Sequence, residues 1–91
     1  MDDTQLGFDL GDTARPAHAP FDPDDIRADA RALIAEARAA TPEAHWDEAT
    51  LRYHRTAFPH LVSWIPDEAE RAQLCFEFTR AADRIEQLLA A

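Results

Sequence analysis

The sequence contains no lysine and no asparagine, and all nine of its basic side chains are arginines. Alanine is frequent, and this combination is typical of a GC-rich bacterial genome. The only cysteine is Cys75, which excludes an internal disulfide and gives no sign of an oxidising compartment. We therefore expect a bacterial protein that folds without disulfides.

Long apolar runs and catalytic motifs are also missing. No apolar run approaches about 18 residues, so we expect no membrane-spanning helix, and the first residues lack the basic and apolar regions of a signal peptide. The sequence has no Gly-rich phosphate loop, no G-x-S-x-G and no H-E-x-x-H. These absences predict a cytoplasmic protein that is not an enzyme and that uses no cofactor.

Positive charge is scarce, because eighteen acids face nine arginines and the formal net charge is −9. Nucleic acid backbones and anionic membranes attract cationic surfaces, so we expect direct binding to neither. The charge suits a basic protein partner, although acidic surfaces more often serve solubility alone.

The chain divides into a tail and one small domain. Residues 1–21 hold both glycines, two prolines and four aspartates and show no helical period, so they predict a flexible, disordered acidic tail. Residues 22–91 predict an all-α domain, a small bundle of two or three longer helices plus a short Pro-bracketed helical turn. About 70 residues lie near the lower limit for a single core, so pairing with a second copy, as a homodimer, or with a partner is expected.

Residues 22–41 predict the first helix. Asp22 is a good N-cap and Pro23 suits the first helical position, while Thr41 precedes a proline and ends the segment. The apolar positions recur at helical spacing: Ile26, Ala30, Leu33, Ile34 and Ala37. This spacing predicts one buried stripe.

The second helix is predicted within residues 42–58, starting between Pro42 and Asp47, with Pro59 stopping or kinking it. Residues 58–66 predict a short helical turn between prolines, carrying Leu61, Val62, Trp64 and Ile65. A third helix is predicted over residues 66–90 with an apolar stripe at spacings of three and four. We expect five aromatic side chains to form the core: Trp46, Phe58, Trp64, Phe76 and Phe78.

Three groups of residues invite a chemical interpretation. The histidines His45, His54 and His60 are nine and six residues apart, which is not the spacing of zinc ligands, so we expect no metal site. Cys75 falls within the third helix, where a buried and inert thiol is expected. The run R-Y-H-R at residues 52–55 is the only local basic cluster, and we expect a solvated helix face closed by neighbouring acids.

The tail contains the sequence QLGFDL at residues 5–10, in which Leu6, Phe8 and Leu10 alternate with other residues and Gln5 precedes them. This hexapeptide resembles the short motif by which many bacterial replication and repair proteins dock onto the DNA polymerase sliding clamp, in its form Q-L-x-L-x-L. The resemblance implies that the Gln5 amide binds a polar pocket and that the three apolar side chains fill a hydrophobic groove. Phe8 replaces the usual Leu, and Asp9 stands where Pro often pre-orders the peptide.

Two alternatives to clamp docking stay open for these apolar side chains. They could pack on the protein's own helices, or they could enter the groove of another partner. A second functional class also fits the composition, namely a small acidic helical regulator of the antitoxin, inhibitor or DNA-mimic kind that covers a basic protein surface. The leading expectation is a protein-interaction protein that binds through Gln5, Leu6, Phe8 and Leu10.

Overall fold

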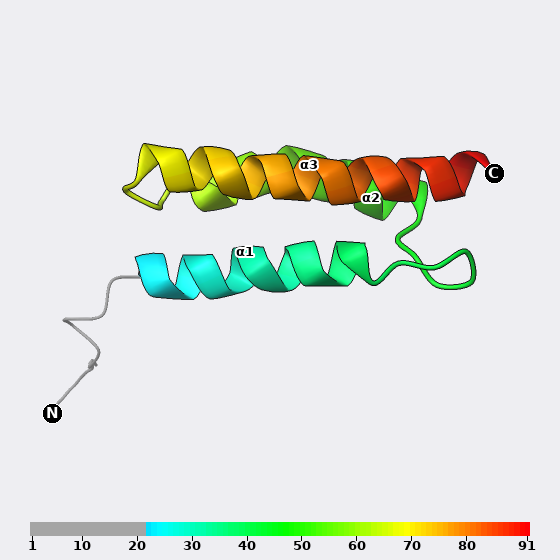
Figure 1. The fold of residues 1–91 in the computed structure, drawn as a ribbon, viewed down its shortest axis with the longest axis horizontal. Coiled ribbons are helices and arrows are strands. Elements are labelled where there is room, and N and C mark those ends of the chain that lie inside the picture. Colours follow the sequence, from blue (N-terminus) through cyan, green and yellow to red (C-terminus); the bar gives the residue numbers. More distant parts are fainter. Residues whose placement is uncertain (1–21) are drawn as a thin grey trace, which may run out of the picture.

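The computed structural model describes residues 22–91, which form a bundle of three helices lying side by side (Figure 1). The helices are α1 (Pro23–Arg38), α2 (Glu48–Val62) and α3 (Glu68–Ala90). The only β-type pairing in this range is an isolated bridge between Thr41 and Ala44, in the connection from α1 to α2. The predicted all-α fold is confirmed.

Each helix begins after an aspartate that caps its first turn. The side chains of Asp22, Asp47 and Asp67 accept hydrogen bonds from backbone N–H groups of their own helices at 2.7–3.0 Å. Such caps satisfy donors that the first turn leaves without a partner. These positions agree with the predicted starts, which were Asp22 for the first helix, a point between Pro42 and Asp47 for the second, and the beginning of residues 66–90 for the third.

Aromatic stacking and alanine contacts hold the core together. Phe58 of α2 and Phe78 of α3 stack with ring centroids 4.2 Å apart and an interplanar angle of 9°. Ala30 and Ala37 on α1 and Ala82 on α3 are fully buried. Side chains this small let helices approach closely, so the predicted stripe of α1 is confirmed as part of the core.

For two of the five aromatic residues, the prediction that they lie in the core is wrong. Phe76 is 56% exposed and Trp64 is 51% exposed. Phe76 lies two positions before Phe78, which places its side chain roughly 200° around the helix from that of the buried Phe78. Trp64 lies in the turn after α2, where helical periodicity no longer decides which side chains face the core. Trp46 is partly buried and packs against the core.

Pro59 neither stops α2 nor separates it from a further element. It lies inside the helix, which continues to Val62, so the predicted Pro-bracketed turn is the last turn of α2. Pro59 is exposed, and only one turn follows it, which limits the disruption that its missing N–H can cause. Val62 and Ile65 are buried, while Leu61 is partly buried.

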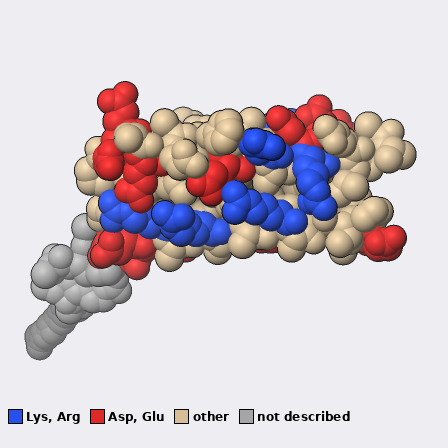
Figure 2. All heavy atoms as spheres, viewed as in Figure 1, with Lys and Arg blue, Asp and Glu red and all other residues tan. Residues whose placement is uncertain are grey.

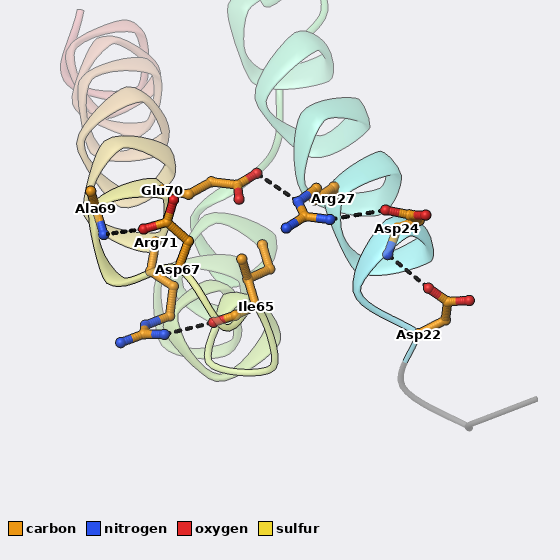
Figure 3. Close-up of polar contacts among 8 residues, drawn as sticks. All are labelled: Asp22, Asp24, Arg27, Ile65, Asp67, Ala69, Glu70 and Arg71. Carbon is orange, nitrogen blue, oxygen red and sulfur yellow. Dashed lines mark hydrogen bonds and ion pairs between the residues drawn. The ribbon is translucent and has the colours of Figure 1, made fainter.

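Polar contacts tie the start of α1 to the start of α3 (Figure 3). The Arg27 guanidinium donates to Glu70 at 2.7 Å and also pairs with Asp24 at 2.9 Å; the hydrogen bond to Glu70 raises the pKa of Arg27. Arg71 donates to the carbonyl oxygen of Ile65 at 2.6 Å, which fixes the connection before α3. None of the helices in residues 22–91 is both long and apolar enough to cross a bilayer.

Candidate functional site

The four residues of the predicted docking motif, Gln5, Leu6, Phe8 and Leu10, lie outside the described residues 22–91. What the structure contributes is the surface of the bundle to which the tail is attached. Two parts of that surface combine a hollow with side chains suited to binding another chain.

The first is a groove between α1 and α2 with a volume of about 410 Å³. Its apolar lining residues are Ala32, Leu33, Ala57, Phe58 and Leu61, and its polar ones are Asp29, Glu36, Tyr53 and His54. Tyr53 is 66% exposed. An apolar floor with two carboxylates on α1 suits a partner segment that is apolar and basic.

The second surface lies between α1 and α3, where arginine side chains form a row on the face seen in Figure 2. Arg38, Arg80 and Arg84 line a hollow there together with Phe76 and Glu77. Arg31 lies near enough to influence Glu77 electrostatically. We call the four arginines Arg31, Arg38, Arg80 and Arg84 the arginine face.

Two of these arginines make their contacts with uncharged groups. Arg84 donates to the carbonyl oxygens of Ala40 at 2.7 Å and Arg38 at 3.4 Å, and so binds acceptors at and just beyond the end of α1. The Arg80 guanidinium lies 5.8 Å from the centre of the exposed Phe76 ring. Carbonyl oxygens and an aromatic ring satisfy a guanidinium without cancelling its charge.

Glu77 is the carboxylate that lines this hollow. Its side chain accepts a hydrogen bond from Gln73 at 2.9 Å and one from Arg38 at 3.1 Å. The Gln73 hydrogen bond, followed by the charges of Arg38 and Arg31, holds the pKa of Glu77 below its ordinary value. Glu77 is therefore ionised at neutral pH, and one negative charge stands among the four positive charges of the arginine face.

The arginine face contrasts with the rest of the domain. Residues 1–21 hold four of the eighteen acids and one of the nine arginines, so residues 22–91 hold fourteen acids and eight arginines. Half of those eight arginines lie on this one face. The sequence carried a signal for this face, because Arg27, Arg31 and Arg38, like Arg80 and Arg84, recur at spacings that fall on one side of a helix. This signal was not used to predict the face.

The basic run at residues 52–55 behaves as predicted, as a helix face closed by acids. Arg55 donates to Asp83 at 2.8 Å and to Glu86 at 2.7 Å, and Arg52 pairs with Glu48 at 3.8 Å. These contacts on α2 and α3 leave the run with little net positive charge.

One histidine lies against the core, and the cysteine is less buried than predicted. His54 lies at the edge of the core, where its ring centroid is 4.4 Å from that of Trp46, and the Trp46 Nε1–H donates to Glu36 at 2.8 Å. Cys75 is partly rather than fully buried. Across residues 22–91, no three histidine, cysteine or acidic side chains gather as metal ligands would.

A scan against protein-family models found no match for this chain. Searches of the curated proteins and of the solved structures found no match either.

Proposed function

We propose that this chain is a non-enzymatic bacterial protein-interaction protein whose N-terminal tail docks into a hydrophobic groove of the DNA polymerase sliding clamp. The observation that carries the proposal is the hexapeptide QLGFDL at residues 5–10. An extended peptide presents alternate side chains on one side, so Leu6, Phe8 and Leu10 would enter one groove while the Gln5 amide binds a polar pocket beside it.

The position of the motif relative to the domain supports this proposal. Eleven residues separate Leu10 from Asp22, the cap of α1. An extended segment of that length spans roughly 35 Å, which is enough for a partner to hold the motif while the bundle stays outside the groove. The helical domain would then be the part that recruits or blocks a further factor.

Energetics predict a modest affinity. Each apolar side chain contributes about 1.5–3 kcal/mol when buried, but a flexible peptide loses conformational entropy on binding. We therefore expect a Kd on the order of micromolar. Replacing Phe8 and Leu10 together with alanine is expected to remove at least about 2 kcal/mol, which is roughly a thirtyfold weakening.

The test is a titration of the full chain, and of a fluorescent peptide of residues 1–14, with a bacterial sliding clamp. The Phe8→Ala/Leu10→Ala variant should bind at least about thirtyfold more weakly and melt at the wild-type temperature. A matched Thr4→Ala/Thr13→Ala variant changes the same segment outside the hexapeptide and should bind as wild type. Absence of saturable binding at high micromolar concentration would contradict clamp docking. A melting temperature lowered by several degrees in the apolar variant would show instead that the tail packs on its own domain.

A second function is favoured by the groove between α1 and α2. Asp29 and Glu36 flank its apolar floor, which suits a small acidic regulator that covers a basic protein surface. A protein partner bound in this way would be lost on an Asp29→Arg substitution and kept by the Phe8→Ala/Leu10→Ala variant. The clamp proposal predicts the opposite pair of results.

A further inference from the structure

We propose that the arginine face of α1 and α3 is a binding surface for the aspartates of this chain's own N-terminal tail. The tail residues concerned are Asp2, Asp3, Asp9 and Asp12. The contact itself is independent of clamp docking, whereas its effect on clamp binding rests on the proposed function. Charge, reach and local concentration each support the tail as the occupant.

Charge complementarity is the first argument. The hollow of this face is lined by three arginines and one carboxylate, Glu77, which gives the lining a net side-chain charge of +2, and Arg31 adds a further positive charge beside it. The tail carries four aspartates and Arg15, which gives it a net side-chain charge of −3 with His18 neutral. Within residues 22–91, Arg31, Arg80 and Arg84 make no ion pair with a carboxylate, so their charges remain available to an acidic segment.

Reach is the second argument. The tail joins the bundle at Asp22, at the start of α1, and Arg38 is the last residue of that helix. A 16-residue helix is about 24 Å long. Asp12 precedes Asp22 by ten residues, a separation that can span roughly 33 Å when extended. Asp12 and the aspartates before it can therefore reach every arginine along α1.

Local concentration is the third argument. Attachment at Asp22 holds the tail close to the face at an effective concentration in the millimolar range. Single exposed ion pairs contribute little, but several aspartates exchanging among four arginines at such a concentration can bind without one fixed geometry. The interaction would be electrostatic, and salt would screen it over a Debye length of about 10 Å at 0.1 M and about 3 Å at 1 M.

The consequence is competition for the tail. One of the four aspartates, Asp9, lies between Phe8 and Leu10, and the other three flank the hexapeptide that would bind the clamp. A tail held on the arginine face is therefore unavailable to a partner groove. If the tail spends about half of its time there, its apparent affinity for the clamp falls about twofold.

The test uses the full chain and needs no clamp. Cys75→Ala removes the natural thiol, Thr4→Cys carries a spin label next to Asp3, and ¹⁵N amide intensities report which surface the label visits. We expect the strongest loss of intensity at Phe76, Arg80 and neighbouring amides of the arginine face. The exposed residues Arg52 and Thr56 on α2 serve as the reference surface and should change little.

Three variants decide which side chains are responsible. Replacing all four tail aspartates with asparagine should abolish the selective loss, as should 1 M salt. Arg31→Gln/Arg80→Gln should do the same. These two arginines are chosen because Arg84 also binds carbonyl oxygens at the end of α1, so that replacing it would disturb the fold as well as the charge. The Phe8→Ala/Leu10→Ala variant should keep the loss.

Two outcomes would overturn the proposal. Equal broadening on both surfaces would show that the tail has no preferred site. A selective loss that survives the asparagine variant but disappears with Phe8→Ala/Leu10→Ala would show apolar docking instead. If the protein does not bind the clamp, the spin-label experiment still tests the contact between the tail and the arginine face, and if that contact is absent, the clamp titration still stands. If both clamp docking and the contact with the arginine face are found, Arg31→Gln/Arg80→Gln should tighten clamp binding about twofold.

Discussion

Replacing Phe78 with alanine is expected to remove a large part of the stability of the bundle, whereas replacing Phe76 is not. The two residues are of the same type on the same helix, yet Phe78 is 3% exposed and Phe76 is 56% exposed. Phe78 also stacks on Phe58 at 4.2 Å and lies 6.3 Å from the Trp46 ring. The pair therefore compares burial directly, with residue type and helix propensity held constant.

The expected magnitudes follow from burial. A buried Phe→Ala substitution costs about 3–5 kcal/mol, and a domain of about 70 residues has a total stability of roughly 3.5–10 kcal/mol. Phe78→Ala should therefore lower the melting temperature by at least about 12 °C or unfold the domain. Phe76→Ala should cost at most about 1 kcal/mol, mainly through its contact with Arg80.

Urea unfolding followed by far-UV circular dichroism measures both variants against wild type. Phe58→Leu, which keeps most of the buried volume, serves as a milder core variant and should fall between them. Equal losses for Phe76→Ala and Phe78→Ala, or a larger loss for Phe76→Ala, would refute the assignment of the buried face of α3.

Two further predictions concern α2. Pro59→Ala should raise the free energy of unfolding by about 1 kcal/mol, because alanine restores an N–H for the carbonyl of Arg55 in an exposed part of the helix; a lower urea midpoint would contradict this. Asp47→Ala should lower the melting temperature at pH 7, because Asp47 caps α2. The backbone N–H of Thr50 lowers the pKa of Asp47 in the folded protein, so its contribution is complete above the ordinary aspartate pKa of about 3.9 and is lost as the pH falls through the lowered value. Thermal melts over a pH series should thus show the variant and wild type converging in acid, and a constant difference would contradict the assignment.

The helix starts and the buried stripes of α1 and α3 were predictable because each depends on nearby residues. An aspartate before a helical pattern satisfies the first free N–H groups wherever the helix packs. Ile26 and Ala30 on α1 follow from spacing alone, as Leu74 and Phe78 do on α3. The end of α2 was less predictable, because the tolerance of Pro59 depends on the exposure of that side of the helix.

The errors at Phe76 and Trp64 have different causes. Helical geometry already places Phe76 away from Phe78, so this error came from treating aromatic content as a cluster without applying the helical angle to each ring. Trp64 lies beyond the last turn of α2, where only the tertiary path of the connection decides burial. The arginine face required the relative placement of α1 and α3, which no pattern within one helix provides.

Among the described residues 22–91, the side-chain contacts that join one helix to another involve α3, and this gives the two candidate surfaces different properties. Arg27–Glu70 and Arg38–Glu77 join α1 to α3, and Arg55–Asp83 joins α2 to α3. Within residues 22–91, no side-chain hydrogen bond or ion pair joins α1 directly to α2.

The arginine face is therefore built on a seam whose polar contacts hold both helices, so the helices that carry its arginines keep their relative placement before any ligand arrives. A surface on helices that are already held together loses less freedom on binding than one that must first be assembled. Within residues 22–91 no ion pair joins α1 to α2 across their groove, although Trp46, just before α2, donates to Glu36 of α1. Such a seam can widen at less cost than one that must also break ion pairs. An extended acidic peptide is thus matched to the α1–α3 face, and a bulkier apolar partner to the α1–α2 groove.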